Sequence, residues 1–153
     1  MQNIPLFSNS VLWLALAAWA LAQIIKAPLH YLSTRTWDWS LLLRAGGMPS
    51  SHSALVAATA HGVGLFHGYD TPLFAVAFAL AVIVIYDATG VRRQAGKHAE
   101  RINAIIEDLR RGKPDWHETQ EQLKEVLGHT PLEAIAGAIL GIGIAQLGWY
   151  LGL

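Results

Sequence analysis

A short polar stretch, GGMPSSHSA over residues 46–54, stands directly before a long apolar run. Its glycines allow positive φ angles and let the backbone come close to a ligand. Ser50 or Ser51 can cap a helix that begins after Pro49, and the N-terminus of a helix binds anions such as phosphate. His52, in the first turn, would be placed to give a proton to a leaving oxygen at neutral pH. The stretch indicates a phosphate site, but the same residues also suit an ordinary helix cap.

A second group of chemically useful side chains follows the third apolar run. Asp87 lies near the end of that run, and Arg92, Arg93 and His98 come shortly after it. Phosphoryl transfer needs cations that neutralise the phosphate oxygens, a nucleophile on one side of phosphorus and an acid on the other. Histidine can take either of the last two roles. The two groups together therefore favour phosphate chemistry with His52 and His98.

A metal centre is the obvious alternative for a chain with seven histidines. Neither H-x-x-x-H nor H-E-x-x-H occurs in the sequence, and these are the spacings that place two imidazoles on one helix face. The chain has no cysteine, so thiolate ligands and disulfides are excluded. We therefore predict no metal and no cofactor.

The composition indicates a membrane protein. Of the 153 residues, 53% are hydrophobic and 14% are charged, whereas about 25% are charged in soluble domains. The formal net charge is zero, which gives no support to nucleic-acid binding. The length predicts a single domain over residues 1–153.

Four apolar segments are long enough to cross or nearly cross a bilayer, which needs about 20 residues. They cover about 11–27, 51–69, 71–88 and 131–153. The first lacks the basic start of a signal peptide, so we expect it to be retained as a membrane helix. Small residues in the second and fourth segments allow close packing and would permit a homo-oligomer. The predicted fold class is an all-α integral membrane protein with four transmembrane helices.

All basic residues fall in two regions, one made of the end of the first span and the loop before the second, the other between the third span and the fourth. With four spans these regions lie on one side of the membrane, and the positive-inside rule makes that side cytoplasmic. We therefore expect a multi-pass protein of the cell membrane whose active face is toward the cytoplasm. The basic residues are Lys26, Arg35, Arg44, Arg92, Arg93, Lys97, Arg101, Arg110, Arg111, Lys113 and Lys124.

The connection over residues 92–127 is predicted to be helical and cytoplasmic. Ile102, Ile105 and Leu109 repeat at helical spacing, which is typical of an amphipathic helix. His98 falls on the same stripe, so we expect this helix to turn His98 toward the membrane bundle.

A shorter helix is expected at about residues 117–127, before the fourth span. Thr130-Pro131-Leu132-Glu133 then matches a capping box with Pro at the first helical position. His129 directly precedes it. This histidine is either a residue of the cap or a third histidine of the phosphate pocket.

Taken in order, the motifs resemble the type 2 phosphatidic acid phosphatase superfamily, which includes vanadium haloperoxidases and some bacterial acid phosphatases. The order is a Lys/Arg loop, a Pro-Ser-x-His motif and an Arg-x5-His motif. The match is closer to its divergent branch of small membrane-embedded bacterial and plant proteins. It covers the chain from about Lys26 to the start of the fourth span, through YLSTRTWDW, GGMPSSHSA, YDATGVRRQAGKHAE and LGHTPLE.

The resemblance implies a phosphatase/haloperoxidase-like bundle and metal-independent hydrolysis of a lipid or isoprenoid phosphate monoester or pyrophosphate. It implies that His52 is the acid for the leaving alcohol and that His98 is the nucleophile, through a phosphohistidine. The implied phosphate-binding residues are Lys26, Arg35, Ser51 and Arg92. Further candidates for the pocket are Ser50, Arg93 and His129.

The chain departs from the family pattern at the residue that orients the nucleophile. An Asp normally lies four positions after the catalytic His, and Ile102 stands at that position. A nucleophilic imidazole without an orienting carboxylate is weaker. We expect Asp87 to take this role, with Glu100, Asn103 and Glu133 as alternatives.

Two other functions remain open on the sequence. One is a non-catalytic membrane protein that binds or transports a phosphate-bearing lipid. The other is a structural membrane protein whose basic face contacts anionic lipids.

Overall fold

The computed structural model describes residues 8–42, 46–112 and 128–153, and the regular elements in these ranges are all helical. This confirms the predicted all-α class for the described residues. The short helix expected at about residues 117–127 lies outside them. The helices are α1 (Ser10–Thr34), the 3-10 helix η2 (Trp39–Leu42), α2 (Ser51–His67), α3 (Pro72–Thr89), α4 (Val91–Gly112) and α5 (Pro131–Tyr150).

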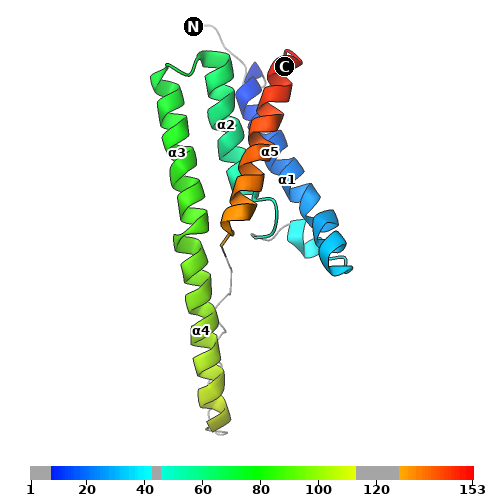
Figure 1. The fold of residues 1–153 in the computed structure, drawn as a ribbon, viewed down its shortest axis with the longest axis vertical. Coiled ribbons are helices and arrows are strands. Elements are labelled where there is room, and N and C mark those ends of the chain that lie inside the picture. The colour runs from blue at the N-terminus through cyan, green and yellow to red at the C-terminus, as the bar shows by residue number, and fades with distance from the viewer. Residues whose placement is uncertain (1–7, 43–45, 113–127) are drawn as a thin grey trace.

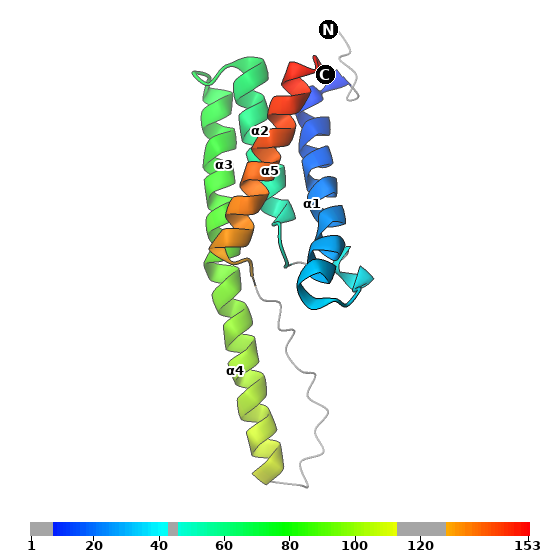
Figure 2. The same cartoon turned by 45° about the vertical axis from the view of Figure 1, so that its right-hand side comes forward.

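Helices α1, α2, α3 and α5 form a bundle, and α2 packs against each of the other three (Figures 1 and 2). The start of α1, the α2–α3 turn and the end of α5 lie at one end of this bundle. The end of α1, the starts of α2 and α5 and the α3–α4 junction lie at the other end. This second end, called the polar end below, gathers the segments that carry most of the predicted site.

Three helical stretches in the described ranges are long and apolar enough to cross a membrane: Ser10–Thr34, Pro72–Glu107 and Pro131–Tyr150. The middle one combines α3 with most of α4, because α4 continues α3 in nearly the same direction. Helix α2 has only 17 residues and is largely enclosed by its neighbours. The structure thus supports a multi-pass membrane protein, and α2 as a fourth span stays a prediction.

Helix α1 is longer than the expected span and continues through Pro28 to Thr34. Proline is tolerated inside membrane helices because neighbouring groups satisfy the freed carbonyl. The helix ends at Arg35, which takes a left-handed conformation with φ 60° and donates its N–H to the Tyr31 carbonyl. As a result Lys26 lies well inside α1 rather than at its end.

Glycines allow α5 to lie directly on α2. A Cβ atom at Gly137 would collide with the Ser50 carbonyl oxygen, and one at Gly141 would collide with that of Ala54. The core between α1, α2 and α5 is likewise built of small residues, as expected for close helix packing in a membrane. The fully packed residues are Ala15, Ala18, Ala22, Ala54, Ala58 and Ala145. This contact fixes the start of α2 against the first turns of α5.

Helix α4 extends past the polar end, away from the bundle (Figure 2). The apolar side chains of its predicted stripe are exposed, at 44% for Ile102, 59% for Ile105 and 49% for Leu109. His98 is exposed as well. Because α4 prolongs α3 instead of folding back, it does not turn His98 toward the bundle, contrary to the sequence-based expectation.

Candidate functional site

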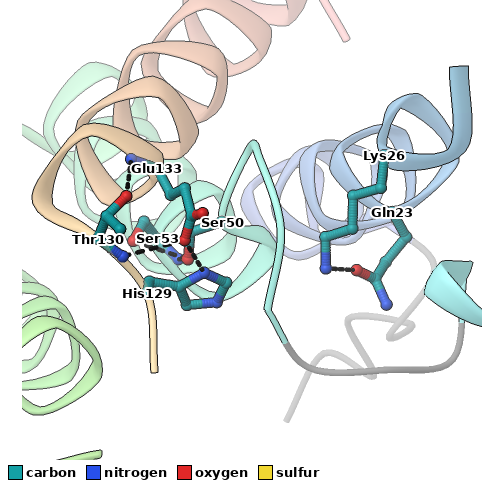
Figure 3. A network of polar contacts seen from close by, with 7 residues as sticks. All are labelled: Gln23, Lys26, Ser50, Ser53, His129, Thr130 and Glu133. Atoms are coloured by element: carbon teal, nitrogen blue, oxygen red, sulfur yellow. Dashed lines mark hydrogen bonds and ion pairs between the residues drawn. The ribbon is translucent and has the colours of Figure 1, made fainter. Parts of the chain in front are cut away.

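Five buried polar side chains lie at the polar end, four of them around the starts of α2 and α5 and one, Lys26, on α1; Figure 3 shows all of them except Ser51. We call them the polar cluster, and each is no more than 4% exposed. Burying a polar group costs free energy unless it is bonded, and burying a charge costs more. Their gathering at one place therefore needs a reason beyond packing. The members are Lys26, Ser50, Ser51, Ser53 and His129.

The serines are positioned by the cap of α2. Ser50 is the N-cap, and its hydroxyl accepts hydrogen bonds from the Ser53 N–H (3.2 Å) and the Ser53 hydroxyl (3.0 Å). The Ser50 N–H donates to the Glu133 carbonyl oxygen at 2.9 Å, which ties this cap to the first turn of α5. Gly46 and Gly47 have φ of 101° and 80°, so the loop uses the positive φ angles that its glycines permit.

Lys26 reaches the cluster from α1. Its amino group donates to Gln23 Oε1, and Gln23 Nε2 donates to the Leu42 carbonyl at 3.0 Å (Figure 3). Lys26 also interacts electrostatically with Glu133 of α5. Ionisable residues within membrane helices are rare and mark functional sites more often than not. Lys26 is therefore the member of the cluster that is hardest to explain by packing alone.

His129 is held between α3 and α5. Its N–H donates to the Ala88 carbonyl at 3.0 Å, and its Nδ1 lies 3.2 Å from Glu133 Oε2. Burial lowers the pKa of His129 below the ordinary value for histidine, and Lys26 and Arg92 lower it further, while Glu133 opposes the shift. The lowered pKa favours the neutral form of the imidazole, which lies beside the Glu133 carboxylate.

His52 lies at the open edge of the cluster, on the first turn of α2. Its ring centroid is 6.2 Å from that of His129, with the planes tilted by 57°. It interacts electrostatically with His129, Arg92 and Lys26. The His52 side chain is exposed, so it lies between the buried cluster and the surroundings of the bundle.

Asp87 forms an ion pair with Arg92, with 2.8 Å between Asp87 Oδ2 and Arg92 Nε. The two side chains are 42% and 67% exposed. Exposed ion pairs of this kind contribute only about 0–1 kcal/mol. Asp87 therefore orients a cation at the edge of the site, and among the described contacts it orients no histidine.

A family model described as the divergent PAP2 family matches residues 7–144. The chain belongs to this family. It is also similar to the uncharacterized membrane protein YuiD of Bacillus subtilis (strain 168), with 47% identity over 150 residues that cover 93% of this chain and 91% of that protein. No solved structure matches the chain. The predicted family is thereby confirmed, and the relative's name agrees with the apolar helices in indicating a membrane protein.

The structure of this divergent PAP2 protein brings together most, but not all, of the residues that the motifs suggested. Arg35 caps α1 and is exposed, and His98 is exposed on α4. Neither has a described contact with the polar cluster. Arg93 is half-buried beside Gly128, where a Cβ atom would lie 2.5 Å from the Arg93 backbone nitrogen. The residues gathered at the polar end are Lys26, Ser50, Ser51, His52 and His129, with Arg92 at the edge.

The sequence did not identify Ser53 and Gln23 as residues of the site, and it gave Glu133 only as an alternative. Ser53 belongs to the quoted motif, three positions after the N-cap, where a cap hydroxyl finds its partners. Gln23 stands three residues before Lys26, on the same helix face. Glu133 was an alternative orienting group, and its spacing of four from His129 was the available indication that the two would meet.

The charged groups of the site are basic side chains and carboxylates rather than a set of metal ligands. In the part of the chain that the structure describes, no group of three or more His, Asp or Glu side chains is arranged so that it could hold a metal ion. The positive charges that would face a bound anion come from Lys26 and Arg92. Together with the serines and two histidines, they can bind a phosphate group and move protons to and from it.

Proposed function

We propose that this divergent PAP2 protein hydrolyses a phosphate monoester or pyrophosphate carried on a lipid or isoprenoid, without a metal ion. The observation that carries the proposal is the buried Lys26 beside the serine-capped start of α2 and the two neighbouring histidines. A buried cation is costly unless anions face it. Glu133 supplies one negative charge, and a bound phosphate would supply the further negative charge that balances Lys26 and Arg92.

Each residue has a role that follows from its position. Lys26, Ser51 and Arg92 would contact the phosphate oxygens and stabilise the charge that develops on them during transfer. His52, at the open edge, would protonate the oxygen of the departing lipid alcohol. Asp87 would hold Arg92 in place through their ion pair. Arg35 has no part in this arrangement.

The bundle provides the membrane placement that a lipid substrate needs. We propose that α2 is the fourth span, since 17 residues at about 1.5 Å each cover nearly the hydrocarbon core. The polar end would face the cytoplasm, because the basic residues that the structure describes lie in the segments at that end or in α4, which extends from it. The acyl or isoprenoid tail would then lie along the exposed apolar surface of the bundle.

This topology can be tested with single cysteines, because the chain has none of its own. Thr36→Cys and Asp70→Cys place exposed thiols at opposite ends of the bundle. In intact cells a membrane-impermeant maleimide should label the Asp70 variant only. Labelling of both, or of the Thr36 variant alone, would contradict the proposed orientation.

The activity is tested by phosphate release from phosphatidic acid and farnesyl pyrophosphate, with purified protein in detergent and a chelator present. Release should persist in chelator, be lost in His52→Gln and be weakened in Lys26→Met. A folded wild-type protein that releases no phosphate from any such substrate would overturn the proposal.

One observation favours a second function, a membrane protein that binds or transports a phosphate-bearing lipid without hydrolysing it. The histidine that the resemblance makes the nucleophile, His98, is exposed and lies outside the polar cluster. This function predicts that labelled phosphatidic acid binds and that Lys26→Met weakens the binding. It also predicts that no phosphate is released.

A further inference from the structure

His129 of the polar cluster forms a pair with the Glu133 carboxylate, and the proposed roles do not yet use this pair. We infer that His129 is the nucleophile, that Glu133 is its positioning residue, and that His98 is not part of the reaction. This inference rests on the proposed phosphatase function. It replaces the assignment that the sequence resemblance implies for His98.

The hydrogen bonds of Glu133 determine which nitrogen of His129 is available. Glu133 Oε2 lies 3.2 Å from His129 Nδ1 and also accepts the Thr130 N–H at 3.0 Å. A carboxylate can only accept, so Nδ1 carries the proton and the lone pair is on Nε2. Figure 3 shows the second ring nitrogen directed away from Glu133. This is the arrangement in which a carboxylate fixes the tautomer of a reactive imidazole.

The backbone around His129 is fixed as firmly as the side chain. The His129 N–H is bonded to the Ala88 carbonyl, which anchors it to the end of α3. At Gly128 a Cβ atom would press on the backbone of Arg92 and Arg93, so the chain passes directly over the start of α4. His129 is 4% exposed. A nucleophile needs this kind of restraint, because misplacement by about 1 Å can cost about 100-fold in rate.

His52 stands where the acid of the same reaction would be needed. The two ring centroids are 6.2 Å apart, and each ring interacts electrostatically with Lys26 and Arg92. A reacting atom approaches its partner to about 3 Å, and two neighbouring rings such as these can both reach one bound phosphoryl group. A phosphoryl group between them would have a nucleophile on one side and a proton donor on the other.

His129, His52 and water account for every bond and proton in the proposed reaction. The Nε2 lone pair of His129 attacks phosphorus, the bond from phosphorus to the lipid oxygen breaks, and His52 gives its proton to that oxygen. Water then attacks phosphorus, gives one proton to the now neutral His52, and the phosphorus–nitrogen bond breaks. Inorganic phosphate leaves, and both histidines return to their starting forms.

His98 lacks each of these features. It is exposed on α4, the helix that extends past the end of the bundle, and the position four residues after it is Ile102 instead of a carboxylate. In the described ranges no ion pair or hydrogen bond joins it to an acidic side chain. The Arg-x5-His spacing of Arg92 and His98 therefore does not bring His98 into the polar cluster.

The decisive experiment locates the trapped phosphate. p-Nitrophenyl phosphate, whose leaving group needs no proton, is reacted with full-length His52→Gln protein and quenched in alkali, which preserves phosphohistidine. Peptide mapping should place the phosphate on His129. Phosphate on His98 would overturn the inference while leaving the phosphatase function standing. If neither release from lipid substrates nor trapping occurs with any folded wild-type sample, the proposed function itself fails.

Substitutions give an independent test. His129→Gln should lower phosphate release by at least about 10³-fold, whereas His98→Gln should keep it near the wild-type rate. His67→Gln, at the opposite end of α2, is the matched control. Loss of release in His98→Gln, with release kept in His129→Gln, contradicts the inference even if trapping gives no product.

Glu133 has a structural role as well, so its test needs a readout other than activity. Its side chain accepts the Thr130 N–H in the capping box, which Gln can also do. Glu133→Gln should lower kcat by about 10² or more and move the acid limb of kcat/KM to lower pH. Glu133→Asp should restore part of the rate. An unchanged pH profile in Glu133→Gln would mean that Glu133 only caps α5.

Discussion

Two histidine clusters lie at opposite ends of α2, and they differ in what surrounds the imidazole. At the far end, His61 Nε2 lies 2.9 Å from Gln146 Oε1, and His61 Nδ1 lies 3.0 Å from the Tyr69 hydroxyl. Both ring nitrogens are thus engaged by neutral partners. This cluster ties α2 to α5 and to the α2–α3 turn.

At the polar end, the hydrogen bond described for the His129 ring is made by Nδ1, and its partner is a carboxylate. Lys26, Arg92 and His52 act on it electrostatically. The comparison teaches that hydrogen bonding of a histidine between helices is not by itself a sign of chemistry. An imidazole with both nitrogens bonded to neutral groups holds helices together, whereas one with an oriented free nitrogen among charges can react.

The largest expected difference between the two ends is in the rate with a lipid substrate. His52→Gln should lower kcat by about 10²–10⁴, because the leaving alcohol then departs without a proton. With p-nitrophenyl phosphate the loss should be much smaller, since that leaving group is stable as an anion. Steady-state kinetics with both substrates check this. Equal losses with the two substrates would contradict the role of His52 as the acid.

Lys26→Met should have the next largest effect. It keeps the length and apolar stem of the side chain but removes a charge-assisted hydrogen bond to phosphate, a bond that contributes about 1.5–3 kcal/mol. We therefore expect kcat/KM to fall about 10–100-fold, mainly through KM. Phosphate release measured against substrate concentration gives this value. Lys26→Arg is the control that keeps the charge, and an unchanged KM in the Met variant would exclude phosphate contact by Lys26.

The pH dependence of kcat/KM should reflect the surroundings of His129. Its pKa is lowered, so the neutral, nucleophilic form persists below the ordinary histidine value of about 6.5, and activity falls about tenfold per pH unit only below that shifted pKa. Lys26 and Arg92 lower this pKa, and Glu133 raises it. The acid limb should therefore move to higher pH in Lys26→Met and to lower pH in Glu133→Gln. Ionisation of the substrate is the same for all variants and cannot produce opposite shifts. If the acid limbs of Lys26→Met and Glu133→Gln moved in the same direction, the assignment of this limb to His129 would be contradicted.

The smallest effect on activity is expected at the far end. His61→Phe removes the hydrogen bonds to Gln146 and Tyr69, which should destabilise the protein by about 1–3 kcal/mol. Below the lowered melting temperature, phosphate release should stay close to wild type. A thermal melt and an activity assay on the same sample compare the two. If His61→Phe abolished release while remaining folded, the division between a structural and a reactive cluster would fail.

The local structure of the motif GGMPSSHSA could be predicted from the sequence because it depends on residues that are close together in the chain. A helix cap, two glycines with positive φ and a first-turn histidine depend on residues that are neighbours in sequence. The same holds for the capping box at Thr130 and Glu133, which the structure contains as predicted. Hydrophobic length similarly located α1, α3 and α5, since a bilayer imposes a minimum span on each helix.

The direction of α4 and the partners of the charged residues could not be read in this way. His98 lies after the start of α4, and His129 lies just before α5, so the sequence made both plausible site residues. The apolar repeat of the segment after residue 91 favoured His98. The choice depends on whether α4 folds back or prolongs α3, which is decided by contacts between segments distant in sequence. Asp87 likewise had two possible partners, and the structure pairs it with Arg92.

By itself the sequence determined the membrane class, the family, the helical elements and the presence of a glycine-rich motif whose serine caps a helix. These follow from composition, hydrophobic length and caps, which act over a few residues. Only the tertiary structure decided which groups meet: Lys26 from α1, Ser50 from α2 and Glu133 from α5 lie far apart in the chain. They are brought together because glycines at positions 137 and 141 let α5 lie directly on α2. That close approach sets His129 and its carboxylate beside His52.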